Sequence, residues 1–208
     1  VAFNAAKALA EPGAPRFSPL YLHSNTGQGK THLMHAIGQA YLDAVPEATA
    51  IYMPAERFMF EFVRAVRERD TFAFKARLRG VDLLMIDDLQ FIAGKESTQE
   101  EFFHTVDEFM REGKRLVIAA DRSPLALEGI EARLASRLGS GLAVDIKPAE
   151  LGLRRTILDI GHRGDGAIFR AEIGLDDERG VARAGDREDD GNESEPPEED
   201  CHARRGSA

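Results

Sequence analysis

The sequence contains one cysteine, no tryptophan and no long run of apolar residues. Cys201 is the only cysteine among the 208 residues, so an internal disulfide is excluded and a reducing compartment is favoured. The longest uncharged runs, such as Phe17–Gly29, are polar and fall short of the roughly 20 apolar residues that cross a bilayer. No basic start followed by an apolar stretch indicates a secretory signal. These absences argue against a membrane protein or a disulfide scaffold, and we expect a cytoplasmic location.

Acidic charge is concentrated near the end of the sequence. The net charge is -9, and residues 159–208 alone contain 15 acidic residues against 7 arginines and no lysine. The segment Arg187–Asp200 has no apolar residue, so it cannot bury enough surface to offset the entropy of ordering. We therefore predict a core over residues 1–158 and an acidic, mostly disordered tail over residues 159–208. This tail is either an interaction segment or a solvated appendage.

Short apolar segments alternate with longer segments of helical periodicity. This pattern predicts an α/β fold in which a mostly parallel sheet is flanked by helices. Strands are expected at Leu20–His23, Thr49–Met53, Asp82–Asp87, Arg115–Ala120 and Leu142–Ile146. Buried helical faces are expected at Leu33, Ile37, Ala40 and Tyr41, at Phe58, Met59, Phe62 and Val66, and at Phe102, Phe103, Val106 and Phe109. The last of these helices has capping-box spacing at Ser97–Glu100 and is expected to end at Gly113.

The first expected strand leads into a glycine-bearing turn and then a Lys-Thr pair that opens a helix. Residues 24–31 read SNTGQGKT and resemble the phosphate-binding pattern G-x-x-x-x-G-K-[ST], with Ser24 in place of the first glycine. In such a loop, backbone N–H groups surround phosphate oxygens, and the helix N-terminus adds a favourable dipole. Lys30 is expected to reach the β- and γ-phosphates of ATP, and the Thr31 hydroxyl to bind Mg²⁺. The nucleotide contacts are expected at Asn25, Thr26, Gly27, Gln28, Gly29, Lys30, Thr31 and His32.

Two adjacent carboxylates follow the third expected strand. Asp87 and Asp88 come directly after the apolar run of residues 83–86. In a parallel sheet they would emerge at the same edge as the phosphate loop. Asp87 would then hold Mg²⁺, and Asp88 would orient or deprotonate the water that attacks the γ-phosphate. Without the phosphate loop, the same pair of residues is typical of a turn or a helix cap.

Five motifs, in this order, resemble those of the DnaA family of bacterial chromosomal replication initiators. They are Gly27–Leu33 (GQGKTHL), Ile86–Phe91 (IDDLQF), Gln99–Thr105 (QEEFFHT), Asp121–Pro124 (DRSP) and Arg133–Leu138 (RLASRL). The similarity runs from about Asn4 to Leu158 and covers the nucleotide-binding core of an AAA+ domain. The resemblance implies a P-loop AAA+ core with a doubly wound, parallel five-stranded sheet in the strand order 5-1-4-3-2.

The resemblance also implies roles for residues outside the phosphate loop. Asp121, after the fourth expected strand, matches the sensor 1 region of the family and would respond to the γ-phosphate; from the residues alone, a helix N-cap is an equal alternative. Arg137 matches the arginine finger that completes the site of a neighbouring subunit, with Arg133 as a second contact. The alternative is a solvated helix face. Such a finger contributes roughly 10³–10⁵-fold in related enzymes, so an isolated subunit should hydrolyse ATP slowly.

Basic and aromatic residues alternate in the region 57–80, between the second and third expected strands. In the family an insertion here handles single-stranded origin DNA, and Val63 aligns with a family DNA contact. Lys95 lies in the matching loop after the third strand, whereas Ser97 stands where some relatives carry a DNA-contacting arginine. The residues concerned are Arg64, Arg67, Arg69, Lys75, Arg77 and Arg79, with Phe60, Phe72 and Phe74. The alternative assigns most of the aromatic residues to the core and the arginines to a solvated face.

Taken together, the motifs predict an ATP- and Mg²⁺-binding replication initiator core that assembles on origin DNA, promotes duplex opening and hydrolyses ATP slowly. We expect it to be cytoplasmic and nucleoid-associated. Family members also carry a helicase-loading domain, a helical lid and a duplex-reading helix-turn-helix domain, and none of these is recognisable here. We therefore expect a truncated chain, and one hypothesis is that residues after about Leu158 are an out-of-frame continuation. The alternatives are a regulatory module that pairs with full-length initiator through Arg137, and a decayed remnant without turnover.

Overall fold

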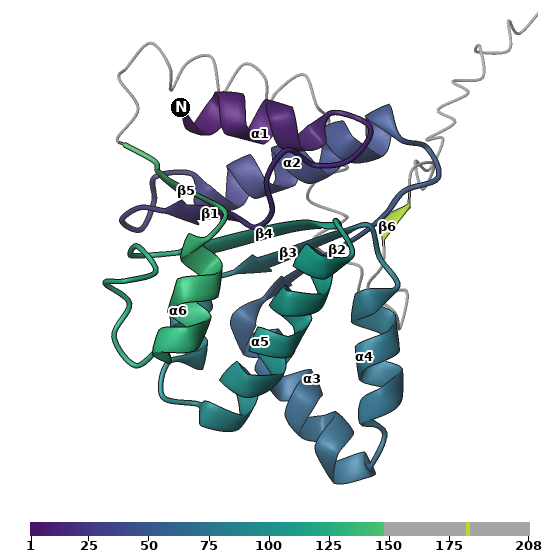
Figure 1. Ribbon diagram of the computed structural model, residues 1–208, viewed down its shortest axis with the longest axis vertical. Helices are drawn as coiled ribbons and strands as arrows, with labels where there is room; N and C mark the ends of the chain where they lie inside the picture. Colours follow the sequence, from purple (N-terminus) through teal and green to yellow (C-terminus); the bar gives the residue numbers. More distant parts are fainter. Residues whose placement is uncertain (148–181, 184–208) are drawn as a thin grey trace, which may run out of the picture.

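The fold is built on one twisted sheet, seen in a computed structural model that describes residues 1–147 and 182–183 (Figure 1). The strand order is β5-β1-β4-β3-β2-β6. The strands are β1 (Leu20–His23), β2 (Thr49–Pro54), β3 (Leu83–Asp87), β4 (Arg115–Ala120), β5 (Leu142–Asp145) and β6 (Ala182–Arg183). The first five are parallel to one another, so the expected α/β class and the order 5-1-4-3-2 are confirmed.

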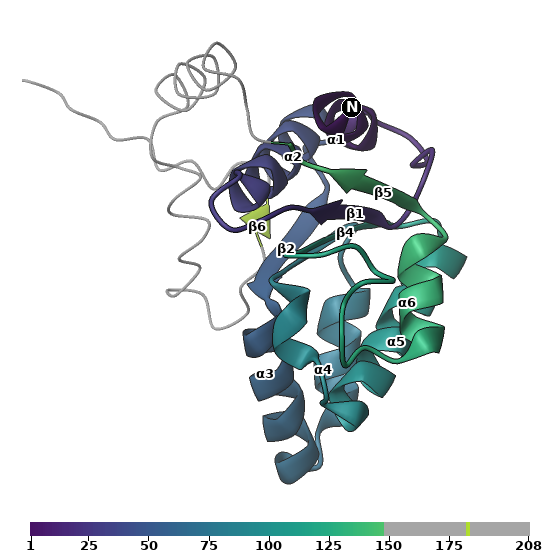
Figure 2. The same ribbon diagram turned by 90° about the vertical axis from the view of Figure 1, so that its left-hand side faces the viewer.

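Helices cover both faces of this sheet (Figures 1 and 2). On one face lie α1 (Ala2–Ala10) and α2 (Lys30–Ala44). On the other lie α3 (Ala55–Glu68), α4 (Thr71–Arg79), α5 (Glu96–Arg111) and α6 (Ala132–Gly139). Successive side chains of a strand point to opposite faces, and Val117 accordingly packs in the cluster beneath α1 and α2 while Ile118 packs in the other. Both clusters are apolar, because a parallel sheet is covered on both sides.

The central strands show why the apolar runs were easy to recognise. All five residues of β3 and all six of β4 are buried. A strand that is buried on both faces reads as a continuous apolar run rather than as an alternation. The expected strand ends are therefore right to within one residue, as comparison with the observed bounds shows.

Several details of the helices differ from the expectations. In α2 the buried stripe runs through Met34, Ile37, Gly38 and Tyr41, and Ala40 is exposed because it lies off this stripe. Gly38 lets α2 approach β3 closely, since a Cβ at this position would lie 2.8 Å from Met85 Cε. The stripe follows the helical repeat from Met34, which the sequence analysis left out.

In α3 the buried stripe also differs, because Val66 is 50% exposed. The expected capping box is wrong: α5 begins at Glu96, with Lys95 as its N-cap, and no side chain caps it. The expected end of that helix is confirmed, because Gly113 has a φ of +65° and Lys114 N–H donates to the Phe109 carbonyl over 2.9 Å.

The sequence analysis did not anticipate α1 or β6. The two residues of β6 pair antiparallel with Thr49 and Ala50 of β2. The rest of the tail expected over residues 159–208, and the domain boundary expected at residue 158, lie outside the described residues. Within the two described ranges, no helix is both long enough and apolar enough to cross a bilayer.

The strand order determines where functional side chains can meet. Because β1, β4 and β3 are neighbours, the loops that follow these three strands leave the same edge of the sheet side by side. In the ladders, His23 of β1 is paired with Ala120 of β4, and Ile86 of β3 with Ile118 of β4. Ligands of open parallel sheets bind at this carboxyl edge.

Candidate functional site

The loop between β1 and α2 has the backbone shape that a phosphate cradle requires. Gly27 has a φ of +79° and Gly29 has a φ of +93°. Residues other than glycine rarely adopt these values. Ser24, which stands where the pattern has its first glycine, is not among the residues of positive φ, so it fits the loop without backbone strain. The backbone N–H of Ser24 donates to Ala120 O of β4 over 3.4 Å, which attaches the start of the loop to the sheet.

Lys30 is a buried cation at the N-terminus of a helix. Its side chain is only 8% exposed, and Nζ donates to Ser24 O over 2.9 Å and to Asn25 O over 3.4 Å. The first turn of α2 contains no acidic residue. A helix N-terminus already carries a partial positive charge and unpaired N–H groups, so a lysine there adds to the positive potential. The arrangement favours a bound anion.

Thr31 and Asp87 meet at the carboxyl edge, as the sequence predicts. Thr31 Oγ1 donates to Asp87 Oδ2 over 2.6 Å, although the two residues are 56 positions apart. Asp87 is 2% exposed, and it also accepts a bond from Tyr52 of β2 over 3.2 Å and one from Asp88 N–H over 2.8 Å. A hydroxyl and a carboxylate at this separation are hard oxygen donors, the ligands that Mg²⁺ prefers. The residues present therefore fit a magnesium ion.

Asp88 has an unusual backbone conformation. Its φ is +53°, and Arg69 is the only other described residue besides glycine with a positive φ. Asp88 precedes the 3₁₀ helix η1 (Leu89–Ile92), but its carboxylate makes no capping bond to that helix. Instead Oδ1 accepts a bond from Gln90 Nε2 over 2.9 Å. Asp88 thus occupies the N-cap position of η1, but its carboxylate does not cap that helix.

Asp121 follows β4 directly. The next helix, α6, begins only at Ala132, so Asp121 is not a helix N-cap. Its Oδ1 is buried and has no hydrogen-bond partner within the described part of the chain, and Oδ2 lies 3.7 Å from Arg122 Nε. Tyr21 OH donates to Arg122 O over 3.0 Å. Burial, and secondarily the Asp121 carboxylate, raise the pKa of Tyr21, so this phenol remains a neutral donor.

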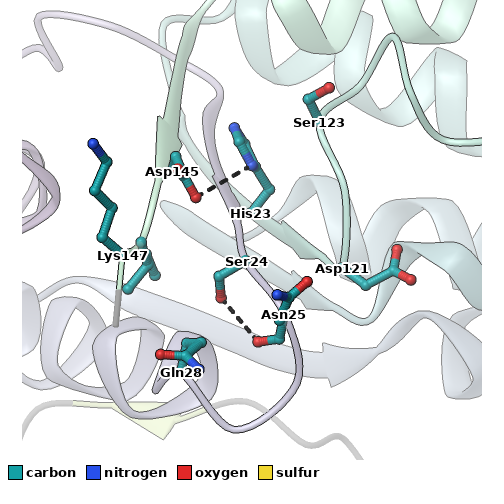
Figure 3. A pocket seen from close by; sticks show the side chains of 9 residues that line it. His23, Ser24, Asn25, Gln28, Asp121, Ser123, Asp145 and Lys147 are labelled. Atoms are coloured by element: carbon teal, nitrogen blue, oxygen red, sulfur yellow. Dashed lines mark hydrogen bonds and ion pairs between the residues drawn. The ribbon is translucent and has the colours of Figure 1, made fainter. Parts of the chain in front are cut away.

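A hollow of about 370 Å³ lies at the carboxyl ends of β1, β4 and β5 (Figure 3). Among the predicted nucleotide contacts, Asn25, Gln28 and Asp121 line it. Figure 3 shows His23 and Asp145 facing each other from β1 and β5, with His23 Nδ1 3.8 Å from Asp145 Oδ1. The remaining lining residues are Ser24, Ser123, Ile146 and Lys147.

The sequence analysis missed the part of this hollow that comes from β5. His23 and Asp145 are partners in the parallel ladder between β1 and β5, and only that register brings them together. Other predicted residues do not line the hollow. These are Thr26, Gly27, Gly29, Lys30, Thr31, Asp87, Asp88 and the exposed His32.

Arg137 lies on α6, away from the residues that line the hollow. Its Nη2 pairs with Asp107 Oδ1 of α5, and the side chain is 40% exposed. Arg133, one turn earlier, contacts Glu131 over 2.7 Å and stacks 5.1 Å above the Phe103 ring. Both arginines thus lie on a partly exposed face of the molecule.

The basic and aromatic segment divides between the core and the surface. Phe74 is buried against Phe58, with ring centroids 5.4 Å apart, and the core alternative holds for this residue. Three basic side chains of α4 are ion-paired to glutamates: Lys75 to Glu101, Arg77 to Glu61 and Arg79 to Glu108. The exposed set consists of Phe60, Val63, Arg64, Arg67, Arg69 and Phe72. Lys95 is also exposed, at the N-terminus of α5.

Comparison with known proteins places these features in a family. The family model for the bacterial DnaA ATPase domain matches residues 1–145. The chromosomal replication initiator protein DnaA of Zymomonas mobilis is 58% identical over 158 residues, which cover 76% of this chain and 33% of that protein. The chain therefore spans about a third of the length of the curated relatives it matches.

Solved structures agree with this similarity. Domain III of the Thermotoga maritima replication initiation protein DnaA superposes with a TM-score of 0.69 at 33% identity, covering 85% of this chain and 74% of that one. A replication initiator DnaA bound to AMPPCP and single-stranded DNA has a TM-score of 0.62 at 33% identity, covering 70% of this chain and 44% of that one. Both structures therefore share sequence as well as fold with this chain.

Proposed function

The chain belongs to the bacterial DnaA ATPase domain family, and on this premise we propose that it binds ATP with Mg²⁺, hydrolyses it slowly and assembles on origin DNA to promote duplex opening. Location at the chromosome, in the nucleoid, is part of the same proposal. The observation that carries it is the meeting of Lys30, Thr31 and Asp87 at one edge of the sheet. These residues come from two separate motifs and together satisfy the requirements of a nucleoside triphosphate.

Binding would exchange the present partners of Lys30 for phosphate oxygens. Lys30 Nζ now donates to two uncharged carbonyl oxygens of its own loop. An anionic phosphate oxygen is a stronger acceptor for an ammonium group than a carbonyl oxygen is, because two opposite full charges attract more strongly than a charge and a dipole. Gly27 and Gly29 have the left-handed backbone conformation that such a cradle uses, and the segment Asn25–His32 would enclose the phosphates.

Thr31 and Asp87 would hold the magnesium ion, which neutralises charge on the β- and γ-phosphates when bound. Tyr52 and the Asp88 N–H keep the Asp87 carboxylate in place by donating to it. Asp88 would orient the attacking water, since its carboxylate is held next to Asp87, the proposed magnesium ligand. Asp121, with a buried oxygen that lacks a described partner, would respond to the γ-phosphate at the end of β4.

Assembly and DNA contact would use surfaces outside the nucleotide site. Arg137 lies partly exposed on α6 and would complete the site of a second copy, with Arg133 as a further contact. Val63 and Arg64 on α3 and Lys95 before α5 are exposed, and we propose them as contacts for single-stranded origin DNA. Arginine side chains beside exposed apolar groups suit a strand that offers phosphates and base faces.

Calorimetric titration of the chain with ATP and Mg²⁺ tests this proposal. We expect saturable binding and slow turnover, with both abolished by Lys30→Ala and unchanged by Lys7→Ala, which alters an exposed lysine of α1. Binding without turnover, alone and with a full-length initiator, would instead support a regulatory module that acts through Arg137. If the folded chain binds neither ATP nor ADP, the proposal is wrong and the chain is a remnant.

A further inference from the structure

Gln90 contacts the proposed water-orienting carboxylate from the 3₁₀ helix that follows β3. We infer that Gln90 is a positioning residue that fixes the orientation of Asp88 for ATP hydrolysis. This inference rests on the proposed function, because it assigns a part of that reaction to a residue that has not yet been given one. Gln90 Nε2 donates to Asp88 Oδ1 over 2.9 Å, and no other side chain of the described residues donates to this carboxylate.

The backbone at Asp88 supports the inference. A non-glycine residue in the left-handed region is strained and persists when surrounding contacts hold it there. Three hydrogen bonds hold Asp88: its N–H donates to Asp87 Oδ1 over 2.8 Å, its carbonyl accepts from Phe91 N–H over 3.1 Å, and its carboxylate accepts from Gln90. Two of these bonds fix the backbone and only the third fixes the carboxylate. Without Gln90, the side chain of Asp88 would be free to rotate.

The chemistry of the two side chains determines which end of the amide faces Asp88. An ionised carboxylate only accepts hydrogen bonds, so the NH₂ end of Gln90 must face it. The other end, Oε1, is buried and has no hydrogen-bond partner among residues 1–147 and 182–183. A buried acceptor without a partner lowers stability, so the structure gains nothing at this end of the amide. The side chain is therefore better explained by its contact with Asp88 than by packing.

Gln99, a buried glutamine, shows what a structural amide looks like in the same protein. Gln99 is 1% exposed, and its Nε2 donates to Ile92 O over 3.0 Å and to Gly129 O over 2.8 Å. Its Oε1 accepts from Glu131 N–H over 2.8 Å. Both ends of Gln99 are therefore paired, to three backbone groups from two segments. Gln90 differs, because its Nε2 donates to the Asp88 carboxylate whereas its Oε1 has no hydrogen-bond partner among the described residues.

A double-mutant cycle between Gln90 and Asp88 tests the inference. The variants are Gln90→Met, which keeps the length of the side chain and removes the donor, Gln90→Glu, Asp88→Asn and the double variant Gln90→Met/Asp88→Asn. Single-turnover hydrolysis at saturating ATP and Mg²⁺ gives the rate, and calorimetry gives the affinity for ATP. We expect Gln90→Met to lower the rate about 10- to 100-fold, as misplacement of a reacting group does, with ATP affinity changed less than about twofold. Gln90→Glu should lower it further, because two carboxylates then face each other.

The Asp88→Asn background separates positioning from a general structural role. There Gln90→Met should have no further effect, because residues that act as a unit give non-additive losses. An equal loss of rate in both backgrounds, an unchanged rate in Gln90→Met, or loss of cooperative thermal unfolding in both Gln90 variants overturns the inference. Absence of turnover in the parent chain with ATP bound overturns the proposed hydrolysis and this role with it. Turnover that is insensitive to Gln90 overturns only the positioning role.

Discussion

The two edges of the sheet each hold one buried cation, and the partners of the two cations differ. At the amino edge, Arg115 begins β4 and is 5% exposed. It donates to Leu9 O over 2.8 Å, and to Glu11 O and Gly13 O over 2.6 Å each. It also donates to Tyr41 OH over 3.1 Å, and its guanidinium lies 4.1 Å from the centroid of the Tyr41 ring. These bonds attach the end of α1 and the loop after it to the sheet.

At the carboxyl edge, Lys30 is buried almost as deeply, but within the described part of the chain its side chain makes only two hydrogen bonds, both to its own loop. Near it lie Asp88, with a strained backbone, and Asp121, one of whose carboxylate oxygens has no hydrogen-bond partner among the described residues. A buried polar group that is fully paired inside the chain serves the fold, because burial without partners costs free energy. The incomplete pairing at the carboxyl edge therefore distinguishes a binding site from a structural network.

Replacing Arg115 should have the largest effect on stability. Arg115→Met leaves the buried carbonyl of Leu9 without its donor, at a cost of about 1–3 kcal/mol, and also removes the part-buried bonds to the carbonyls of Glu11 and Gly13, which water can replace. We expect the free energy of unfolding in urea to fall by about 2–3 kcal/mol, a loss typical of a broken buried hydrogen-bond network. The affinity of the remaining folded protein for ATP should be unchanged.

Arg111→Met is the matched control for this experiment. Arg111 is 70% exposed and its contact with Glu108 is 3.9 Å long, so its loss should change stability by less than about 0.5 kcal/mol. An Arg115 variant as stable as this control would show that the amino edge does not need its cation, and the distinction between the two edges would fail.

Replacing Lys30 should change stability much less and binding much more. Lys30→Met removes two bonds to loop carbonyls and also a positive charge that the helix dipole opposes. We expect the free energy of unfolding without nucleotide to stay within about 1 kcal/mol of the parent, the net worth of an ordinary hydrogen bond. The parent should gain about 2.7 kcal/mol when ATP is present at 100 times its dissociation constant, and the variant should gain nothing.

Urea titrations with and without ATP and Mg²⁺ measure both quantities on the same samples. The comparison would break down if Lys30→Met lost as much stability as Arg115→Met, since Lys30 would then be a structural cation. It would also break down if the variant kept the stabilisation by ATP.

The two edges also differ in how far the sequence predicts them. The meeting of Thr31 with Asp87 was predictable, because two local motifs each end a buried strand and parallel strands end at one edge. The Arg115 network was not, since its partners lie more than 70 positions away in α1, the following loop and α2. No local sequence pattern indicates which carbonyl oxygens a buried arginine will donate to.

The same limit explains the smaller errors. His23 and Asp145 meet through the register of β1 and β5, which depends on tertiary packing. The spacing at Ser97 resembled a capping box, but α5 starts earlier, at Glu96. Val66 continued a helical apolar face and is nevertheless half exposed. Periodicity identified the helices, whereas burial at their ends depends on which neighbours are present.

The smallest effect on stability is expected at Asp88, the strained residue of the carboxyl edge. Asparagine tolerates the left-handed conformation as aspartate does, and Asp88→Asn keeps an acceptor for Gln90. Loss of a charge beside Asp87 offsets the weaker hydrogen bond, so we expect the free energy of unfolding to change by less than about 0.5 kcal/mol. Asp88→Ala should instead lose about 1–2 kcal/mol, because alanine has no such tolerance for a φ of +53°. Turnover should fall in both variants. A stability loss in Asp88→Asn as large as in Asp88→Ala would mean that the charge of this carboxylate serves the fold, and Asp88 would then belong with Arg115 rather than with Lys30.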